Sequence, residues 1–324
     1  MAADEITDVA VVALPLRTKF RGIVVREALI FRGSQRWSEF SPFIEYEDDE
    51  AAQWLAGAVS WANDPLPSSF RQSIPVNATL PAVGVDEVAD VLSPFGRFSS
   101  VKIKVAEKGQ GLKDDIARAR RVRDLYPDAK IRLDANAGYT TVQTMQVARE
   151  LKNLELEYIE QPVKTIAELK ELRNWLAEEQ IPLKVAVDES IRKSTDPLLV
   201  AREQAADIAV IKVQPLGGIR RALAIASESG LEIVVSSALE SSIGISHGLH
   251  LAAAMPTLSY DCGLATARLL GGDVVDSPLV PVNGEIELRE VDPSEELLEK
   301  YAASPERTTW WLERLERCRQ LLET

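Results

Sequence analysis

Cysteine and histidine are scarce in this sequence of 324 residues. The two cysteines, Cys262 and Cys318, do not make the disulfide framework of a small secreted protein, and we interpret both as reduced structural thiols. The two histidines, His247 and His250, fall in one helical pattern, where we expect structural positions. Their scarcity argues against a zinc site built from a histidine cluster and against histidine-based acid–base chemistry.

Long apolar runs and positive charge are also limited. No uninterrupted apolar run approaches the roughly 20 residues that cross a bilayer, and residues 1–8 are acidic, unlike a signal peptide. The 50 acidic residues outnumber the 37 basic ones, and the net charge of −13 argues against nucleic acid or an anionic membrane as a partner. We therefore expect a cytoplasmic protein, a monomer or small homo-oligomer, that binds a small molecule.

From about residue 74, short β-branched segments alternate with segments whose apolar residues recur at helical spacing. This alternation is typical of a parallel sheet covered by helices. Eight expected strands favour a closed barrel, and no Gly-x-Gly-x-x-Gly follows the first strand as in a dinucleotide-binding fold. The expected strands cover residues 74–80, 100–105, 130–134, 157–160, 183–188, 208–214, 232–237 and 258–262.

Both ends of the chain depart from this alternation. Residues 1–73 contain two β-like runs and a helical stretch at 49–61, and Pro65 and Pro67 mark the change into the barrel. Residues 281–324 contain a short β-like run and end in an amphipathic helix. We interpret 1–73 and 281–324 as one α+β module across the mouth of a barrel formed by residues 74–280.

Charged residues recur at the ends of the expected strands. Glu160 follows Asp134 by 26 residues, Asp188 follows Glu160 by 28, and Lys212 follows Asp188 by 24. That step equals about one strand, one helix and two loops of a (β/α) barrel, whose strand ends meet at one mouth. The residues expected to converge there are Lys102, Lys104, Asp134, Glu160, Asp188 and Lys212.

The three acids predict a metal site. A single carboxylate at a strand end is more often a helix cap or a solvated loop residue. Three carboxylates that meet at one point repel one another unless a hard cation neutralises them. We therefore predict that Asp134, Glu160 and Asp188 bind Mg²⁺, with Mn²⁺ able to substitute.

The lysines predict acid–base chemistry. In Val-Lys-Ile-Lys-Val at 101–105, Lys102 and Lys104 share one strand face and should point into the barrel. Alone, such a pair is more often solvated at a sheet edge. Beside each other and a divalent cation, both lysines should have lowered pKa values, which makes a general base. Lys212 lies in Ala-Val-Ile-Lys-Val, too apolar for a solvated lysine, and should face them across the mouth.

Further polar residues accompany these strand ends. Asn136 and Glu189 could orient the metal ligands or pair with a lysine. Arg132 shares a strand face with Asp134 and could bind a substrate carboxylate or pair with a barrel acid. Ser236 and Ser237 could offer hydroxyl or backbone N–H groups to a carboxylate, although turn formation explains them equally well.

These residues resemble a known family. The Lys-x-Lys pair, the three acids and the opposing lysine are similar to the muconate-lactonizing subgroup of the enolase superfamily. Dipeptide epimerases of that subgroup carry Asp-x-Asp after the eighth strand, whereas this chain has Asp-Cys-Gly at 261–263. The segments that look most like o-succinylbenzoate synthases, of the actinobacterial type, are Asp-Ala-Asn-Ala-Gly-Tyr at 134–139, Ile-Glu-Gln-Pro at 159–162, Ile-Lys-Val-Gln-Pro-Leu-Gly-Gly at 211–218, Ser-Ser-Ala-Leu-Glu-Ser at 236–241 and Asp-Cys-Gly-Leu-Ala-Thr at 261–266.

The resemblance implies an α/β fold, a modified TIM barrel (β/α)7β with an α+β capping domain formed by both chain ends. It implies a Mg²⁺-dependent dehydration of 2-succinyl-6-hydroxy-2,4-cyclohexadiene-1-carboxylate to o-succinylbenzoate, a step of menaquinone biosynthesis. Lys104 would remove the proton, Lys212 would stabilise the enediolate anion, and Gly263 would lie beside the substrate. The 17–26 loop of the cap would line the succinyl pocket.

Two alternatives remain open at this stage. An N-succinylamino acid racemase, or another racemase, epimerase or cycloisomerase, would use Lys104 and Lys212 as bases on opposite faces of the substrate. A catalytically inactive barrel could serve as a binding module. The six charged residues in otherwise apolar settings argue against the second alternative.

Overall fold

A computed structural model describes residues 6–194 and 196–323. The chain begins with a three-stranded antiparallel sheet in the order β1-β2-β3. β1 and β2 are joined through Arg21 and Gly22, whose φ angles of 48° and 82° fit a two-residue hairpin turn with two left-handed residues. This turn puts Arg21 at the tip of the hairpin. The three strands are β1 (Thr7–Phe20), β2 (Ile23–Arg32) and β3 (Trp37–Phe40).

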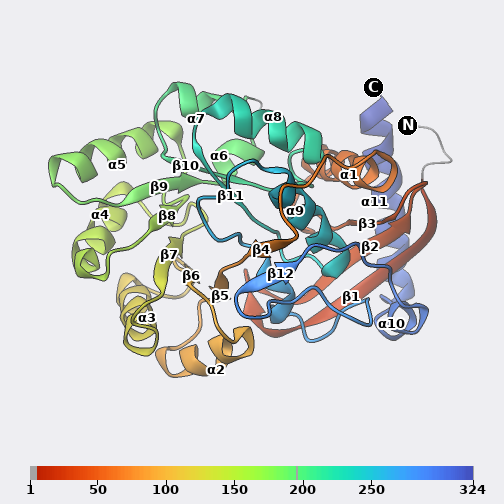
Figure 1. The fold of residues 1–324 in the computed structure, drawn as a ribbon, viewed down its shortest axis with the longest axis horizontal. Coiled ribbons are helices and arrows are strands. Elements are labelled where there is room, and N and C mark those ends of the chain that lie inside the picture. The colour runs from red at the N-terminus through yellow and green to blue at the C-terminus, as the bar shows by residue number, and fades with distance from the viewer. Residues whose placement is uncertain (1–5, 195, 324) are drawn as a thin grey trace.

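Two helices pack beside this first sheet. α1 (Asp48–Asn63) contacts β3, and α11 (Pro305–Glu323), from the other end of the chain, packs against α1 and β1. Figure 1 shows α11 beside α1 and the three strands, next to the larger sheet. Trp311 of α11 contacts Phe40 edge to face, with ring centroids 5.9 Å apart. The two chain ends therefore share one apolar core.

The larger sheet has seven parallel strands that follow one another in chain order. Its ring is closed by residues 262 and 263, which bridge in parallel to Val76 and Ser236 on either side. The strands are β5 (Ala78–Leu80), β6 (Ser100–Lys104), β7 (Lys130–Asp134), β8 (Tyr158–Glu160), β9 (Lys184–Val187), β10 (Ile208–Ile211) and β11 (Glu232–Val235).

Helices cover the outside of this ring (Figure 1). Among the residues that the structure describes, no helix has the length and apolar character needed to cross a membrane. The α-helices are α2 (Val88–Leu92), α3 (Leu112–Leu125), α4 (Thr141–Glu150), α5 (Ile166–Glu178), α6 (Glu189–Arg192), α7 (Leu199–Arg202), α8 (Ile219–Ser229), α9 (Ser242–Ala254) and α10 (Glu295–Lys300). Short 3₁₀ turns are η2 (Val85–Glu87), η3 (Ser93–Phe95), η4 (Lys152–Leu154) and η5 (Ala265–Leu269).

The strand pleat decides which side chains enter the barrel. Odd-numbered residues such as Ile103, Leu133 and Ile159 are fully buried in the large core between the sheet and the helices. Even-numbered residues lie on the other face, and the small cluster that contains Tyr158 and Val210 occupies the barrel interior. The alternation expected for 101–105 is therefore confirmed, and the inward face carries the charged residues.

The barrel predicted from the sequence is confirmed, with two differences. Residues 74–80 are two strands, since β4 (Ser73–Pro75) pairs with β12 (Glu285–Glu287) and β5 begins after a break. The strand expected at 258–262 was wrong, because only Cys262 and Gly263 form isolated bridges. The carbonyl of Asp261 accepts a hydrogen bond from Arg132 Nη1 at 2.7 Å. This carbonyl therefore bonds to a side chain and not to the backbone of a neighbouring strand.

The division into a cap at 1–73 and 281–324 and a barrel at 74–280 stays a proposal. Within the last segment, β12 pairs with β4 at the start of the barrel, and α10 and α11 contact β1. His247 stacks on Trp61 of α1 with centroids 4.5 Å apart, so this histidine has a structural position between the two parts. Both cysteines are free and buried.

The cap docks on the barrel at very short range. A Cβ on Gly57 of α1 would lie 2.9 Å from the Cα of Gln214, so glycine permits this approach. Arg26 of β2 donates hydrogen bonds to the carbonyls of Leu239 and Ala238, at 3.2 and 3.3 Å, in the loop after β11.

Glu39 of β3 makes the most specific of these contacts. Its carboxylate accepts hydrogen bonds from Ser241 N at 3.1 Å, Gly244 N at 3.2 Å and Ser41 Oγ at 2.6 Å. Glu39 therefore caps the N-terminus of α9 from another part of the fold. Burial and the nearby Glu240 raise the pKa of Glu39 to about 7.

We predict that the buried Glu39 makes folding stability depend on pH. Its pKa is raised from 4.5 in the unfolded chain, so the folded protein binds more protons between about pH 4.5 and 7. The stability contribution of Glu39 should therefore fall as pH rises through this window, by up to about 1.4 kcal/mol per pH unit, and level off above it.

Urea unfolding of wild type and Glu39→Gln from pH 5 to 8 tests this expectation. The stability of the variant should fall less steeply with pH, because its side chain does not titrate. Glu287→Gln, at an exposed position on β12, is the matched control and should follow wild type. Parallel curves for wild type and Glu39→Gln would contradict the raised pKa.

Candidate active site

The charged residues predicted to converge do meet at the carboxyl ends of the barrel strands. Asp134 and Glu160 are direct register partners on β7 and β8, and Lys104 is the partner of Asp134 on β6. Asp188 follows β9 directly, and Lys212 follows β10. The three carboxylates are at most 1% exposed. Strand order and pleat therefore bring together residues up to 110 positions apart, from 102 to 212.

Each carboxylate is paired with a lysine. Lys104 Nζ lies 2.5 Å from Asp134 Oδ2, Lys102 Nζ lies 2.8 Å from Glu160 Oε2, and Lys212 Nζ lies 2.7 Å from Asp188 Oδ2. Lys102 also approaches Asp134 Oδ2 at 3.6 Å. Three cations thus compensate three anions that are removed from water, as a buried cluster requires.

The three acids differ in the direction in which their surroundings shift the pKa. Burial, together with Asp134, raises the pKa of Glu160 to about 7. Burial also opposes ionisation of Asp134, but Lys104 and Lys102 outweigh it and lower the pKa of Asp134 to about 2. Lys212 and Arg192 likewise hold the pKa of Asp188 below its usual range against burial. Glu160 is therefore the carboxylate that most lacks positive charge.

The two lysines of β6 differ as well. Burial and the neighbouring Lys102 lower the pKa of Lys104, although Asp134 works in the opposite direction. For Lys102, Glu160 and Asp134 outweigh burial and raise the pKa. The lowered pKa values were expected for both lysines beside a divalent cation; in the protein alone, the carboxylates on either side of Lys102 act in the opposite direction. Lys104 is the more readily deprotonated of the two.

The three carboxylates have the chemistry of a metal site, although lysines now occupy the space between them. Among the described residues, no group of three or more histidine, cysteine or acidic side chains is gathered closely enough to hold a metal as it stands. Each acid faces a lysine instead. One observation still favours a cation: Glu160 Oε1 is buried without a hydrogen-bond partner. Three carboxylates on adjacent strands also match the oxygen donors that Mg²⁺ prefers, so the donor set fits.

Asn136 and Glu189 connect to this cluster. Lys104 Nζ donates to Asn136 Oδ1 at 2.8 Å, and Asn136 Nδ2 donates to Glu189 Oε1 at 3.2 Å. The backbone of Asn136 is left-handed, with φ 44°, a conformation that asparagine tolerates. Of the two residues, Asn136 thus contacts a lysine directly, whereas Glu189 reaches Lys104 only through Asn136.

Arg132 forms an ion pair and hydrogen bonds within the barrel. Its Nε pairs with Glu157 Oε2 at 2.6 Å, and its Nη1 donates to Asn77 Oδ1 at 3.0 Å. Arg132 precedes Asp134 by two residues on β7, and its side chain is fully buried. Of the two roles that the sequence left open for Arg132, the structure therefore shows the pairing with an acid of the barrel, Glu157.

A cleft lies above the charged cluster, between barrel and cap. Ser236, Ser237 and Gly263 line it, and Ser237 Oγ donates to the carbonyl of Gly263 at 2.6 Å. A Cβ on Gly263 would lie 2.4 Å from Ser236 Oγ, so this wall has no room for a side chain. The barrel residues that line the cleft are Thr79, Lys102, Lys104, Asp134, Asn136, Lys212, Ser236, Ser237, Ala238, Leu239, Gly263 and Thr266.

The cap contributes residues that the sequence did not single out individually. Phe20, Arg21 and Phe43 line the same cleft. The Arg21 guanidinium carbon lies 4.3 Å from the centroid of the Phe43 ring, and Lys104 Nζ lies 5.4 Å from that of Phe20. The basic and aromatic segment 17–26 was the available signal for Phe20 and Arg21. It was expected to be a loop, but the structure shows the end of β1, the turn at Arg21 and Gly22, and the start of β2. Phe43 carried no signal, because only the packing of β3 against the hairpin brings it to the cleft.

Comparisons with known proteins agree with this architecture. A family model described as enolase C-terminal domain-like matches residues 85–293, and one described as enolase N-terminal domain-like matches residues 11–62. Muconate lactonizing enzyme from Pseudomonas putida superposes with a TM-score of 0.74 at 19% identity, covering 91% of this chain and 98% of the other. For 2-chloromuconate cycloisomerase from Rhodococcus opacus 1CP the TM-score is 0.77 at 21% identity, covering 93% and 100%. Fold and site define a protein of the enolase superfamily.

Relatives of higher sequence identity specify the family within this superfamily. An o-succinylbenzoate synthase of Thermobifida fusca is 48% identical over 294 residues, which is 90% of this chain and 91% of the relative. That of Mycolicibacterium smegmatis is 46% identical over 323 residues, or 99% and 98% of the two chains. The chain belongs to the o-succinylbenzoate synthase family, and so to the carbon–oxygen lyases, the hydro-lyase class of enzymes.

We predict that Glu160→Gln lowers the affinity for a divalent cation. The amide removes the charge of the carboxylate whose Oε1 is buried without a hydrogen-bond partner, so the dissociation constant for Mn²⁺ should rise at least about tenfold. Electron paramagnetic resonance of free Mn²⁺ measures this, with circular dichroism to verify folding.

Glu179→Gln is the control for this experiment, because Glu179 pairs with Arg149 on the surface. Its Mn²⁺ affinity should equal that of wild type. A folded Glu160→Gln protein with wild-type affinity would contradict the assignment of Glu160 as a ligand.

Proposed function

We propose that this protein is an o-succinylbenzoate synthase. In this proposal it dehydrates 2-succinyl-6-hydroxy-2,4-cyclohexadiene-1-carboxylate to o-succinylbenzoate, in menaquinone biosynthesis and with Mg²⁺. The observation that carries the proposal is one cleft lined by Lys104 from β6 and Lys212 from the strand end of β10, with buried carboxylates beneath. The close similarity to synthases along nearly the whole chain supports it.

Asp134, Glu160 and Asp188 are the residues that would hold Mg²⁺. When bound, the ion would supply positive charge for a substrate carboxylate and so acidify the adjacent C–H bond. With the three lysines protonated, the six side chains are already close to neutral as a set. Added positive charge therefore favours loss of a proton from a lysine, and Lys104 has the lowered pKa.

Lys104 would then act as the general base. Its Nζ takes the α-proton as the C–H bond breaks, and the electron pair enters the enediolate. The resulting ammonium returns that proton to the leaving hydroxyl on the same face, so that the C–O bond breaks and water leaves. Asn136 holds Nζ at 2.8 Å and Lys102 holds Glu160 at 2.8 Å, which fixes the base beside the acids.

Lys212 would stabilise the anion from the opposite side. It is 9% exposed and paired with Asp188, and as an ammonium it adds positive charge where the enediolate develops. The cap would complete the cleft. Phe20 and Phe43 offer apolar cover that excludes water, and Arg21 offers a cation for the carboxylate of the succinyl group.

A second candidate is an N-succinylamino acid racemase. The observation that favours it is that both Lys104 and Lys212 line the cleft, as two bases on opposite faces of a substrate require. Purified protein with Mg²⁺ should be assayed for aromatic product from the cyclohexadiene and, in parallel, for racemisation of N-succinylamino acids. Absence of aromatic product in protein that binds Mn²⁺ would reject the synthase.

We predict different losses for the two lysines. Lys104→Ala should abolish both dehydration and the exchange of the α-proton of a non-eliminating substrate analogue in D₂O, because the base is gone. Lys212→Ala should abolish turnover through lost anion stabilisation and retain some exchange. Proton nuclear magnetic resonance measures the exchange. Loss of one donor that stabilises an oxyanion typically lowers kcat by a factor of about 10²–10³.

The outcome also separates the candidates. Exchange that persists in Lys104→Ala and disappears in Lys212→Ala would reverse the two roles. Under the racemase alternative, each variant would keep exchange for one enantiomer of an N-succinylamino acid and lose it for the other.

A further inference from the structure

Arg192 lies beside the candidate metal site and is not used by the mechanism above. It ends the short helix α6, which begins directly after Asp188. Its side chain is 4% exposed. Arg192 Nε pairs with Asp188 Oδ1 at 3.1 Å, and its Nη2 pairs with Glu189 Oε1 at 3.1 Å. Helical spacing of three and four residues puts both acids within reach of one guanidinium.

The same guanidinium reaches the cap. Arg192 Nη1 lies 2.9 Å from Glu50 Oε1 in the first turn of α1, and Nη2 donates to Tyr46 Oη at 3.2 Å. Tyr46 Oη also accepts a hydrogen bond from Arg21 Nη1 at 3.3 Å. Arg21 lines the cleft over the lysines. A continuous polar path therefore runs from the hairpin tip of the cap to Asp188.

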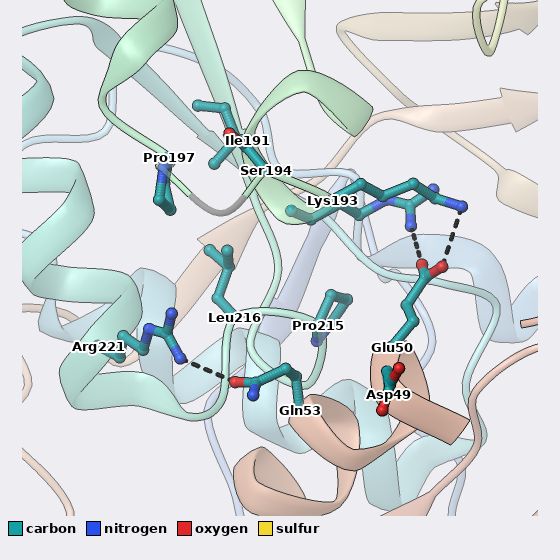
Figure 2. Close-up of a pocket in the computed structure, with 11 residues that line it drawn as sticks. Asp49, Glu50, Gln53, Ile191, Lys193, Ser194, Pro197, Pro215, Leu216 and Arg221 are labelled. Carbon is teal, nitrogen blue, oxygen red and sulfur yellow. Dashed lines mark hydrogen bonds and ion pairs between the residues drawn. The ribbon is translucent and has the colours of Figure 1, made fainter. Parts of the chain in front are cut away.

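The neighbouring Lys193 provides a comparison on the same helix end. Its Nζ lies 3.1 Å from Glu50 Oε2 and 4.3 Å from the centroid of the Tyr46 ring. Figure 2 shows Glu50 pointing toward Lys193 across the pocket between α1 and the end of α6. Lys193 thus contacts the cap as Arg192 does, but no ion pair joins it to Asp188 or Glu189 among the described residues.

A second branch connects Arg192 to the base. Glu189 Oε1, which Arg192 holds, accepts a hydrogen bond from Asn136, and Asn136 accepts one from Lys104. Asp188 uses Oδ1 for Arg192 and Oδ2 for Lys212. Arg192 therefore holds the Asp188 carboxylate through Oδ1, and Oδ2 stays directed at Lys212 and the other charged residues of the barrel mouth. Its planar fork of five N–H donors serves all four partners, which an ammonium does not match.

We propose that Arg192 is a positioning residue that couples cap docking to the metal ligand Asp188 and, through Glu189 and Asn136, to the base Lys104. The proposal rests on the proposed function for the roles of Asp188 and Lys104. Because coupling of two binding events is reciprocal, ligand contact with the cap should tighten metal binding, and metal should tighten ligand binding. A merely structural ion pair would affect stability alone.

Mn²⁺ binding to Arg192→Lys tests the first part of the proposal without any substrate. This variant keeps the positive charge and loses the fork, so its Mn²⁺ dissociation constant should rise about 10- to 100-fold, as for other residues that orient ligands. Lys193→Arg, the reverse exchange at the adjacent position, is the matched control and should bind Mn²⁺ as wild type does. Wild-type affinity in folded Arg192→Lys would overturn the proposal, since charge alone would then suffice.

Tyr46→Phe tests the path to the cap and retains every carboxylate contact of Arg192. The measured quantity is the change in Mn²⁺ dissociation constant on saturation with o-succinylbenzoate. We expect tightening of about fivefold or more in wild type and its loss in Tyr46→Phe, with Mn²⁺ affinity of the free protein within about twofold of wild type. Equal tightening in both proteins would overturn the coupling through Tyr46.

The two experiments separate this proposal from the proposed function. Arg192→Lys is judged on metal affinity alone, so weakened Mn²⁺ binding supports positioning even if the cyclohexadiene yields no product. Product formation by wild type together with unchanged Mn²⁺ affinity in Arg192→Lys would retain the synthase and reject the role of Arg192.

Discussion

The mouth of this barrel depends on how three buried carboxylates are neutralised. Asp134, Glu160 and Asp188 are nearly inaccessible to water, and in the structure each faces one lysine ammonium. A buried charge is tolerated only with a partner, so cluster and fold stabilise each other. The same arrangement leaves Glu160 with a raised pKa and an unpaired oxygen, and leaves Lys104 with a lowered pKa. In the proposed function, a divalent cation would supply the positive charge that Glu160 lacks, and Lys104 would be the lysine that loses a proton.

The cap not only covers the cleft but also contacts the residues that form its wall and its carboxylates. Glu39 caps the N-terminus of α9, and Arg26 holds the carbonyls of the loop after β11, which lines the cleft. Arg192 links Glu50 and Tyr46 of the cap to Asp188. Each contact joins the N-terminal part of the chain, residues 26–50, to the barrel part, residues 188–241. Movement of the cap would therefore disturb both the cleft wall and the carboxylates.

Much of the fold and cluster could be predicted, because both follow from local rules. Strand alternation assigns Lys102 and Lys104 to one face, and the repeat length assigns the acids to successive strand ends. The depth of a side chain in the barrel and its neighbours on other strands could not be read from the sequence. Arg132 shares the face of Asp134 but pairs with Glu157. The pKa of Lys102 is raised because Glu160 lies 2.8 Å away, and the expected strand at 258–262 is reduced to bridges.

The sequence by itself determined the barrel, the inward face of each strand and the identity of the six converging charges, since these depend on spacings of a few residues and on one repeating unit. Only the tertiary structure decided which lysine pairs with which acid, that Phe43 and Arg21 close the cleft, and that Arg192 joins cap to barrel. The lysine–acid pairs join residues 24 to 58 positions apart, and Arg192 and Tyr46 are 146 positions apart. The distances between these residues depend on how whole helices and strands pack together. A local sequence pattern does not determine that packing.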